Sequence, residues 1–413
     1  MEKHWIWLTT RKGIGPVGRA ALIRLFGSAE RVYALTEEMC RSTEGFEARW
    51  LEGVLDKDLS AAEQILVDCD NKDIHIVCYH MDEYPDRLRS LPDAPPVLYY
   101  RGSLPNFDDE AAIAVVGTRK CSAYGLLHAK QFSRLIAASG GMIISGGARG
   151  IDTMALRGAL DSMMPVACVL GCGVDVVYPP ENRFLFRDIV AHGCLLSEYP
   201  PGTRPEGRHF PVRNRILSAL SLGVLVVEAP QRSGALITAS HALEQGRDVF
   251  AVPGAIDSPA SEGTNRLIRD GAMLATNGWD VMRDYAPLFP GKVGYRPGGQ
   301  SLDLTPEQQR EALPEQPEKQ EKPAQTAAPD EKVFDKTESR PYIELDTILS
   351  GVEGDERTLV MQLAEKPLTT DELIERSQLP AARVMASLTL LEIRGVVRCG
   401  HDKRVSLAGA ESS

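Results

Sequence analysis

The sequence lacks the long apolar runs of a membrane protein and any overall excess of positive charge. None of its apolar runs approaches the roughly 20 residues that a membrane-spanning helix needs, and its first residues contain no apolar core of signal-peptide length. The 413 residues carry a formal net charge of −11 at pH 7, so a surface that attracts anions must be local. We therefore expect a cytoplasmic protein without a membrane partner.

The usual motifs of nucleotide hydrolysis, dinucleotide binding and metal catalysis are also missing. There is no GxxxxGK[ST] motif, which argues against ATP hydrolysis of the P-loop kind, and the GGARG run at 146–150 differs from the dinucleotide fingerprint GxGxxG. No HExxH motif or carboxylate cluster suggests a metal site, GxSxG is absent, and the 8 cysteines form no CxxC pair. We expect reduced, mostly buried thiols, no metal, no cofactor and no catalytic residue.

The most informative motif that is present is SGGARGID, residues 145–152. It follows an apolar run that predicts a strand and precedes a segment with helical spacing. Glycines allow a positive φ, so successive N–H groups can point into one concavity, and the start of a helix adds further free donors. This arrangement predicts an anion site, most often for phosphate. Its candidate residues are Ser145, Gly146, Gly147, Arg149 and Gly150.

Apolar runs alternate with helical segments from about residue 74 onward. Such alternation predicts an α/β fold with a Rossmann-like, mostly parallel sheet that is covered on both faces. The expected strands are Ile74–Cys78, Val97–Tyr100, Ala112–Val116, Met142–Ile144, Val166–Leu170, Leu195–Leu196, Val224–Val227 and Val249–Val252. Functional loops should follow the carboxyl ends of the parallel strands.

The chain divides into four predicted segments. Residues 1–70 predict a small helical domain of the SAM or helix-hairpin-helix kind, and residues 74–288 predict the Rossmann-like domain. Residues 291–345 are rich in Pro, Glu and Gln and predict a disordered linker, and residues 350–408 predict a winged helix.

The hairpin GIGPVG could hold a DNA phosphate, but we favour plain packing because little positive charge surrounds it. For the winged helix we favour protein contact or accessory packing over DNA reading, because its third helix offers little besides Arg383.

Further loops at predicted strand ends carry glycines, hydroxyl groups and arginines. Arginine suits bidentate phosphate contact, and one aromatic residue, Phe210, lies among four arginines. Basic groups along a backbone with an aromatic platform are what single-strand binding requires. A series of such loops along one sheet edge fits a polyphosphate strand better than one nucleotide. The candidates are Gly117, Thr118, Arg119, Gly173, Arg208, Phe210, Arg213, Arg215, Ser233 and Gly234.

The motifs VVGTRKCSAYG, SGGARGIDTMAL, FPVRNRILSALS and QRSGALITASHALEQGRDVFAVPG resemble those of the DNA-processing protein A (DprA/Smf) family, densely over about residues 100–276. The resemblance implies a homodimeric, non-enzymatic protein that binds single-stranded DNA, protects incoming strands during natural transformation and loads the RecA recombinase. It assigns DNA contact to Arg119, the loop around Gly146 and Gly147, Phe210, and the segment Arg213–Asn214–Arg215. Gly207 stands near where the family often has a basic residue, which leaves open which residue supplies that charge.

The alternative function is a nucleotide-processing enzyme of the phosphoribohydrolase type, which has a related Rossmann-like fold. RSGALIT at 232–238 resembles its PGGxGTxxE loop only loosely. Thr238 stands where that family has its catalytic glutamate, so the carboxylate that the chemistry needs is missing.

Overall fold

The computed structural model describes residues 2–296, 354–364, 368–377, 379–380, 383–384, 387–388, 391, 396–399 and 404–407. The chain forms two compact units, Met1–Glu315 and Gln316–Ser413. The predicted linker 291–345 lies outside the described residues except for its first six. No helix in the described ranges is long and apolar enough to cross a membrane.

The first unit begins with short helices that pack around buried tryptophans. Trp5 and Trp7 are fully buried, and the Trp7 Nε1–H donates to the carbonyl of Asp56 at 2.9 Å. Arg11, which follows the first helix, is also buried and pairs with Asp56 at 2.6 Å. These contacts favour the packing interpretation of the hairpin. The helices are α1 (Glu2–Thr10), α2 (Pro16–Phe26), α3 (Ala29–Tyr33), α4 (Glu37–Ser42), α5 (Leu51–Leu55) and α6 (Ser60–Asn71), with a short 3-10 helix η1 (Ala48–Trp50).

A nine-stranded sheet follows, in the order β1-β2-β6-β5-β4-β3-β7-β8-β9. β1 and β2 pair antiparallel, β2 pairs antiparallel with β6, and all other neighbours are parallel. The predicted mostly parallel α/β sheet is therefore confirmed, and only the short β9 was not expected. The strands are β1 (His75–Cys78), β2 (Val97–Gly102), β3 (Ala112–Val116), β4 (Met142–Ser145), β5 (Val166–Val169), β6 (Gly193–Ser197), β7 (Gly223–Val226), β8 (Asp248–Ala251) and β9 (Met273–Leu274).

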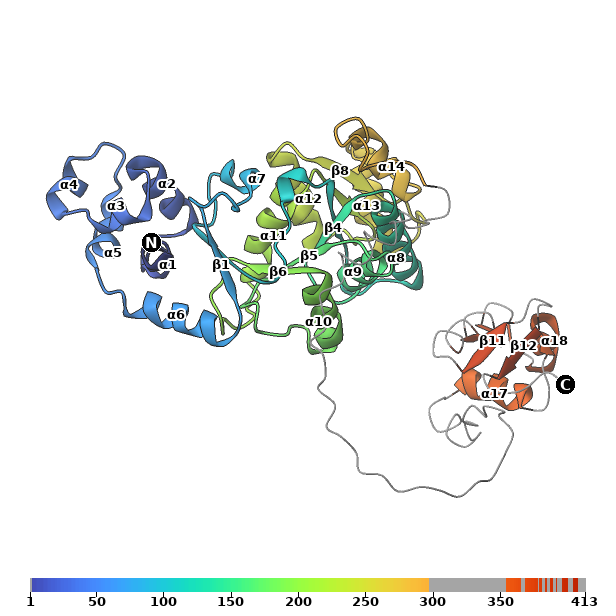
Figure 1. The fold of residues 1–413 in the computed structure, drawn as a ribbon. Helices are drawn as coiled ribbons and strands as arrows, with labels where there is room; N and C mark the ends of the chain where they lie inside the picture. Colours follow the sequence, from blue (N-terminus) through green and yellow to red (C-terminus); the bar gives the residue numbers. More distant parts are fainter. Residues whose placement is uncertain are drawn as a thin grey trace, which may run out of the picture. The chain divides into compact units, whose positions relative to one another are not determined.

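Both faces of the sheet are covered by helices (Figure 1). In β3, Ile113 and Val115 belong to one apolar core while Ala112, Ala114 and Val116 belong to the other, because successive side chains of a strand point to opposite faces. The helices α8 (Ala123–Ala138), α9 (Ile151–Leu160), α10 (Arg183–His192) and α14 (Gly278–Met282) contribute to the first core. The helices α11 (His209–Leu220) and α12 (Gly234–Glu244) contribute to the second, and α13 (Glu262–Arg269) packs beside β8.

The second unit contains α17 (Gly354–Leu363), α18 (Thr370–Ser377) and a three-stranded sheet in the order β10-β12-β11. β11 (Val397–Cys399) and β12 (Arg404–Leu407) pair antiparallel as the predicted wing, and β10 (Leu368–Thr369) adds a third strand. The Thr369 hydroxyl caps α18 by accepting the N–H of Glu372 at 3.3 Å. Most of the predicted third helix, which begins after Pro380, lies outside the described residues.

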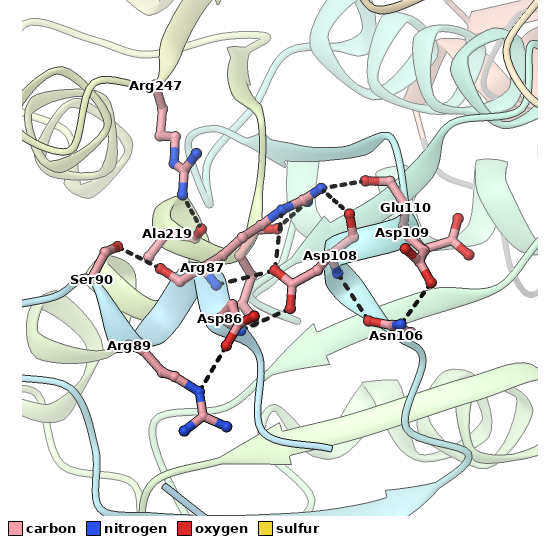
Figure 2. Close-up of polar contacts among 11 residues, drawn as sticks. Asp86, Arg87, Arg89, Ser90, Asn106, Asp108, Asp109, Glu110, Ala219 and Arg247 are labelled. Carbon is pink, nitrogen blue, oxygen red and sulfur yellow. Dashed lines mark hydrogen bonds and ion pairs between the residues drawn. The ribbon is translucent and has the colours of Figure 1, made fainter. Parts of the chain in front are cut away.

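A polar cluster at the amino ends of the strands fixes the end of α11 (Figure 2). Arg87, on the short helix α7 (Asp86–Arg89), donates to the carbonyls of Leu220 at 3.0 Å, Asp108 at 3.2 Å and Glu110 at 2.8 Å. Arg247 donates to the carbonyl of Ala219 at 3.1 Å. Two cations thus contact the last carbonyls of α11, where the helix dipole favours positive charge.

We predict that Arg87→Met destabilises the first unit by about 2–4 kcal/mol, because three carbonyls lose a charged donor. Urea unfolding followed by tryptophan fluorescence measures this change, since all four tryptophans lie in that unit. Arg269→Met is the control, because Arg269 is exposed and pairs only loosely with Asp270 at 3.5 Å; its effect should stay below about 0.5 kcal/mol. Equal losses of stability in the two variants would contradict the conclusion that Arg87 holds the end of α11.

Candidate functional site

A pocket of about 350 Å³ opens where the loops after β3 and β7 meet the start of α11. β3 is the strand at which the sheet order reverses, because the chain moves outward from it in one direction through β4 and β5 and in the other through β7 and β8. Ligands of open α/β sheets bind at this kind of switch point. The pocket is lined by Val116, Gly117, Thr118, Arg119, Ala148, Asp152, Gly207, Phe210, Pro211, Arg213, Asn214, Leu217, Pro230, Arg232, Ser233, Gly234, Ala235 and Thr238.

The loop after β3 is held close to the start of α9. A Cβ on Gly117 would lie 2.5 Å from the side chain of Ile151, so only glycine fits there. The Thr118 N–H donates to the carbonyl of Glu228 at 2.8 Å, which joins this loop to the end of β7. The loop therefore holds Arg119 at the rim of the pocket, with its side chain exposed.

The SGGARGID loop adopts the conformation that its glycines predict. Gly147 has φ +67° and Gly150 has φ +79°, which is the left-handed region that glycine enters without strain. A Cβ on Gly150 would lie 2.7 Å from the Thr118 carbonyl oxygen. The part of this loop that reaches the pocket is Ala148 and Asp152; the side chain of Asp152 accepts the Ala148 N–H at 3.3 Å.

Arg213 lies in the pocket wall and is only 4% exposed. Its guanidinium donates to the carbonyl of Gly146 at 2.8 Å and to the carbonyl of Val169, and its Nε–H donates to the Asn214 side chain at 3.2 Å. A Cβ on Gly146 would lie 2.5 Å from the guanidinium, which would then have to move away from its carbonyl acceptors. Arg213 was expected to hold a DNA phosphate, but its donors are turned toward backbone carbonyls. Its role in this structure is to tie α11 to the ends of β4 and β5.

Phe210 is half-buried at the pocket mouth, with cationic and aromatic neighbours. The Arg119 guanidinium carbon lies 5.1 Å from the centre of the ring, and the Tyr178 ring lies 5.6 Å away at an interplanar angle of 30°. One edge of the Phe210 ring rests on Gly171, where a Cβ would approach to 2.9 Å. A ring that is fixed in this way can present a flat apolar surface to a base.

The start of α12 closes the far side of the pocket. The Ser233 hydroxyl caps the helix by accepting the Ala235 N–H at 3.3 Å, and Gly234 is the first helical residue. The Asn214 side chain reaches across from α11 and donates to the Gly234 carbonyl at 3.4 Å. The free N–H groups of this helix start favour an anion.

The pocket combines an acidic group at its base with cations at its rim. Burial raises the pKa of Asp152 to about 6, although Arg213 and Arg119 oppose that rise. Arg119, Lys120 and Arg232 are exposed, and within residues 2–296 no carboxylate pairs with any of them. Their charge is therefore available to an anionic ligand.

The structure brings half of the predicted site residues to the pocket wall, namely Gly117, Thr118, Arg119, Phe210, Arg213, Asn214, Ser233 and Gly234. The other half lie elsewhere. Ser145 is buried and donates to the Val115 carbonyl at 2.7 Å. Arg149 pairs with Glu181, and Arg208, whose side chain is 79% exposed, pairs with Glu206, each at 2.8 Å.

The prediction that Arg215 contacts DNA does not fit its surroundings. Its side chain is 6% exposed and pairs with Glu198 at 2.6 Å and Asp93 at 2.9 Å. Gly173 packs against the 200–203 turn, with its N–H donating to the Thr203 carbonyl at 3.0 Å. The remaining glycines, Gly146, Gly147 and Gly150, shape the loop around Arg213 and Asn182 without lining the pocket.

Three polar or charged residues of the pocket wall, Asp152, Arg232 and Thr238, were not among the predicted ligands. Asp152 belongs to SGGARGID itself, and an acidic residue at the second position of the helix that follows a phosphate-type loop was the available signal. Cys40, Cys69, Cys78, Cys121, Cys168, Cys172 and Cys194 are free, and all of them except Cys121 are buried, as expected. The described residues contain no cluster of His, Cys, Asp or Glu that could hold a metal ion.

Comparison with known proteins gives consistent matches. Residues 75–286 match the family model described as DNA recombination-mediator protein A, and residues 317–403 match the DprA winged helix domain. Protein Smf of Synechocystis sp. is 38% identical over 275 residues, covering 66% of this chain and 69% of that protein. DNA processing protein DprA of Streptococcus pneumoniae is 44% identical over 206 residues, covering 49% of this chain and 72% of that protein. The X-ray structure of DprA from the same species superposes with a TM-score of 0.61 at 33% identity, over 69% of this chain and 98% of that one.

We predict that Arg213→Met lowers the stability of the first unit by about 3–5 kcal/mol, because breaking a buried charge arrangement leaves Asp152 without its cation. Adding Asp152→Asn should restore about 1 kcal/mol or more, because the pair is coupled. Urea unfolding followed by tryptophan fluorescence gives the free energies of unfolding of the parent, of Arg213→Met and of the double variant. Arg208→Met is the control at the start of the same helix. Strictly additive losses in the double variant would show that the two charges do not act on each other.

Proposed function

Because the chain belongs to the DNA recombination-mediator protein A family, which includes the proteins named DprA and Smf, we propose that it binds single-stranded DNA at the pocket between β3, β7 and α11. The observation that carries this proposal is the position of Phe210. Its ring stands at the pocket mouth beside the Arg119 guanidinium, 5.1 Å away. An aromatic platform next to unpaired cations is the common arrangement for sequence-tolerant single-strand binding.

Membership of this family confirms the expectation that the chain is not an enzyme, because the family is described as recombination mediators. The alternative of a phosphoribohydrolase has no support in the pocket. Thr238, in the position of that family's glutamate, is buried in the pocket wall.

In the proposed binding mode, one base stacks on Phe210 while phosphates meet the cations at the rim. Arg119 and Arg232 are the exposed arginines that line the pocket, and the N–H groups at the start of α12 can add neutral donors. Backbone and stacking contacts carry little sequence information, so the protein should bind strands of different sequence with similar affinity.

We further propose that the protein acts as a homodimer that protects incoming strands during natural transformation and loads RecA onto them. The family description as a recombination mediator supports a role in recombination. RecA filament formation on protein-coated single strands, measured with and without this protein, tests the loading step. Unchanged filament growth would contradict loading while leaving DNA binding intact.

Phe210→Ala and Arg119→Ala should each weaken binding to oligo-dT. Loss of one stacked base costs ~1–3 kcal/mol, which is about a 5- to 150-fold rise in Kd. Fluorescence anisotropy with a labelled oligonucleotide measures the change, and Tyr295→Ala, which removes an exposed ring of the same unit, is the control. Parental affinity in both site variants would refute this site.

The affinity should also depend on salt. If ~4–6 phosphates are neutralised, log K falls against log[salt] with a slope of about −3 to −4, from ~0.7 per contact. A titration of the parent protein at several salt concentrations gives the slope. A flat response would indicate a small nucleotide ligand instead of a strand.

Burial raises the pKa of Asp152 to about 6. The affinity for DNA should therefore rise as the pH falls through this value. Above this pH the ionised carboxylate repels phosphate from the pocket, and below it the protonated group does not. Asp152→Asn should therefore bind oligo-dT about fivefold or more tightly at pH ~8, since one charge at close range is worth ~1 kcal/mol even in water. It should also flatten the pH profile. Anisotropy titrations at constant ionic strength measure both effects, and parallel profiles for parent and variant would exclude Asp152 as the titrating group.

A further inference from the structure

An exposed aromatic residue lies outside the pocket, on the first turn of α10. Phe184 is 67% exposed, and the guanidinium carbon of Arg187 lies 5.6 Å from the centre of its ring. Arg183, the residue before it, is also exposed. We call Arg183, Phe184 and Arg187 the α10 surface. It repeats the combination of ring and guanidinium that Phe210 and Arg119 form at the pocket.

Packing within the first unit does not explain the α10 surface. The side of α10 that faces the core consists of Leu185, Phe186 and Ile189, so Phe184 contributes little to it and leaves apolar area in water, which is unfavourable. Arg183 and Arg187 are four residues apart on one helix face, where like charges repel. Arg187 has only its neighbour Asp188 at 3.7 Å, and no carboxylate of residues 2–296 pairs with Arg183. An anionic partner would relieve this repulsion.

The α10 surface is joined to the pocket by a short, well-bonded segment. Asn182, which directly precedes α10, donates to the Gly147 carbonyl at 3.0 Å and to the Thr153 hydroxyl at 2.8 Å. Gly147 adjoins Ala148, which lines the pocket. The start of α10 therefore lies against the same loop that forms one wall of the pocket.

We propose that the α10 surface is a second contact site for the single DNA strand that occupies the pocket, with a base stacked on Phe184 and phosphates bound by Arg183 and Arg187. The proposal rests on the proposed function. The charge of the surface complements a phosphate backbone, and its continuity with the pocket wall gives one strand a path across both. Single-strand sites commonly extend over several nucleotides with repeated aromatic platforms.

Two oligonucleotide lengths test the proposal. On this proposal, a dT strand of about 6 nucleotides should occupy the pocket alone, whereas one of about 20 should also reach α10. Phe184→Ala should raise the Kd of the long strand about fivefold or more and leave that of the short strand unchanged. Arg183→Gln with Arg187→Gln should reduce the salt slope for the long strand by ~1.4, from ~0.7 per lost contact. Leu288→Ala, which removes an equally exposed side chain, and Arg269→Gln are the matched controls.

The outcomes separate this proposal from the proposed function. If Phe210→Ala weakens both lengths while Phe184→Ala leaves the long strand at parental affinity, the pocket binds DNA and the α10 surface does not; a protein partner would then be its occupant. If Phe184→Ala weakens both lengths equally, the surface is no separate extension and the proposal is overturned. If Phe210→Ala changes neither length, the proposed pocket is wrong, whatever Phe184 does. Unchanged urea midpoints for the α10 variants establish that any loss reflects DNA contact.

Discussion

The buried guanidinium of Arg213 connects α11 with the ends of β4 and β5 and with the start of α9. It extends from α11 and donates to carbonyls at the ends of β4 and β5, and Asp152 at the start of α9 supplies the opposing charge. A buried cation needs both hydrogen bonds and a counter-charge to be tolerated. The glycine at 146 is part of the same arrangement, because a Cβ there would displace the guanidinium. The shape of the phosphate-type loop thus depends on a side chain from another helix.

Fixing α11 in this way also fixes Phe210, which lies one turn before Arg213 on the same helix. The opposite end of α11 is held by Arg87 and Arg247, which donate to the carbonyls of Leu220 and Ala219. A helix that is held at both ends can keep an aromatic side chain at the pocket mouth without burying it. The stability of the fold and the geometry of the proposed DNA contact therefore share the same interactions, and a rigid platform loses less conformational entropy when it binds.

The sequence predicted the strands well because each is a short apolar run between turn signals, and β3 was predicted to the residue. It also predicted that glycine and arginine loops gather at one edge, since the carboxyl ends of parallel strands meet there. It could not predict which arginine side chains face solvent and which are buried against partners within the fold. Arg213 and Arg215 belong to one basic stretch, but their partners, Val169 and Asp93, are distant in sequence. Local composition shows that a cation is present. Long-range contacts decide whether that cation stabilises the structure of the site or contacts the ligand.

The division between paired and unpaired cations explains how a chain of net charge −11 can present a positive surface. The buried arginines Arg213 and Arg215 face carboxylates within the fold, so they add less to the field outside than the exposed cations do. Arg119, Lys120 and Arg232 are exposed at the pocket rim without carboxylate partners in residues 2–296, so their field acts on the solvent side, where a Debye length of about 8 Å limits its reach. A strand is then attracted near the rim and along the proposed α10 surface, while the net negative charge of the rest of the protein repels it. Local charge of this kind favours one defined path for DNA over general adhesion to the whole protein.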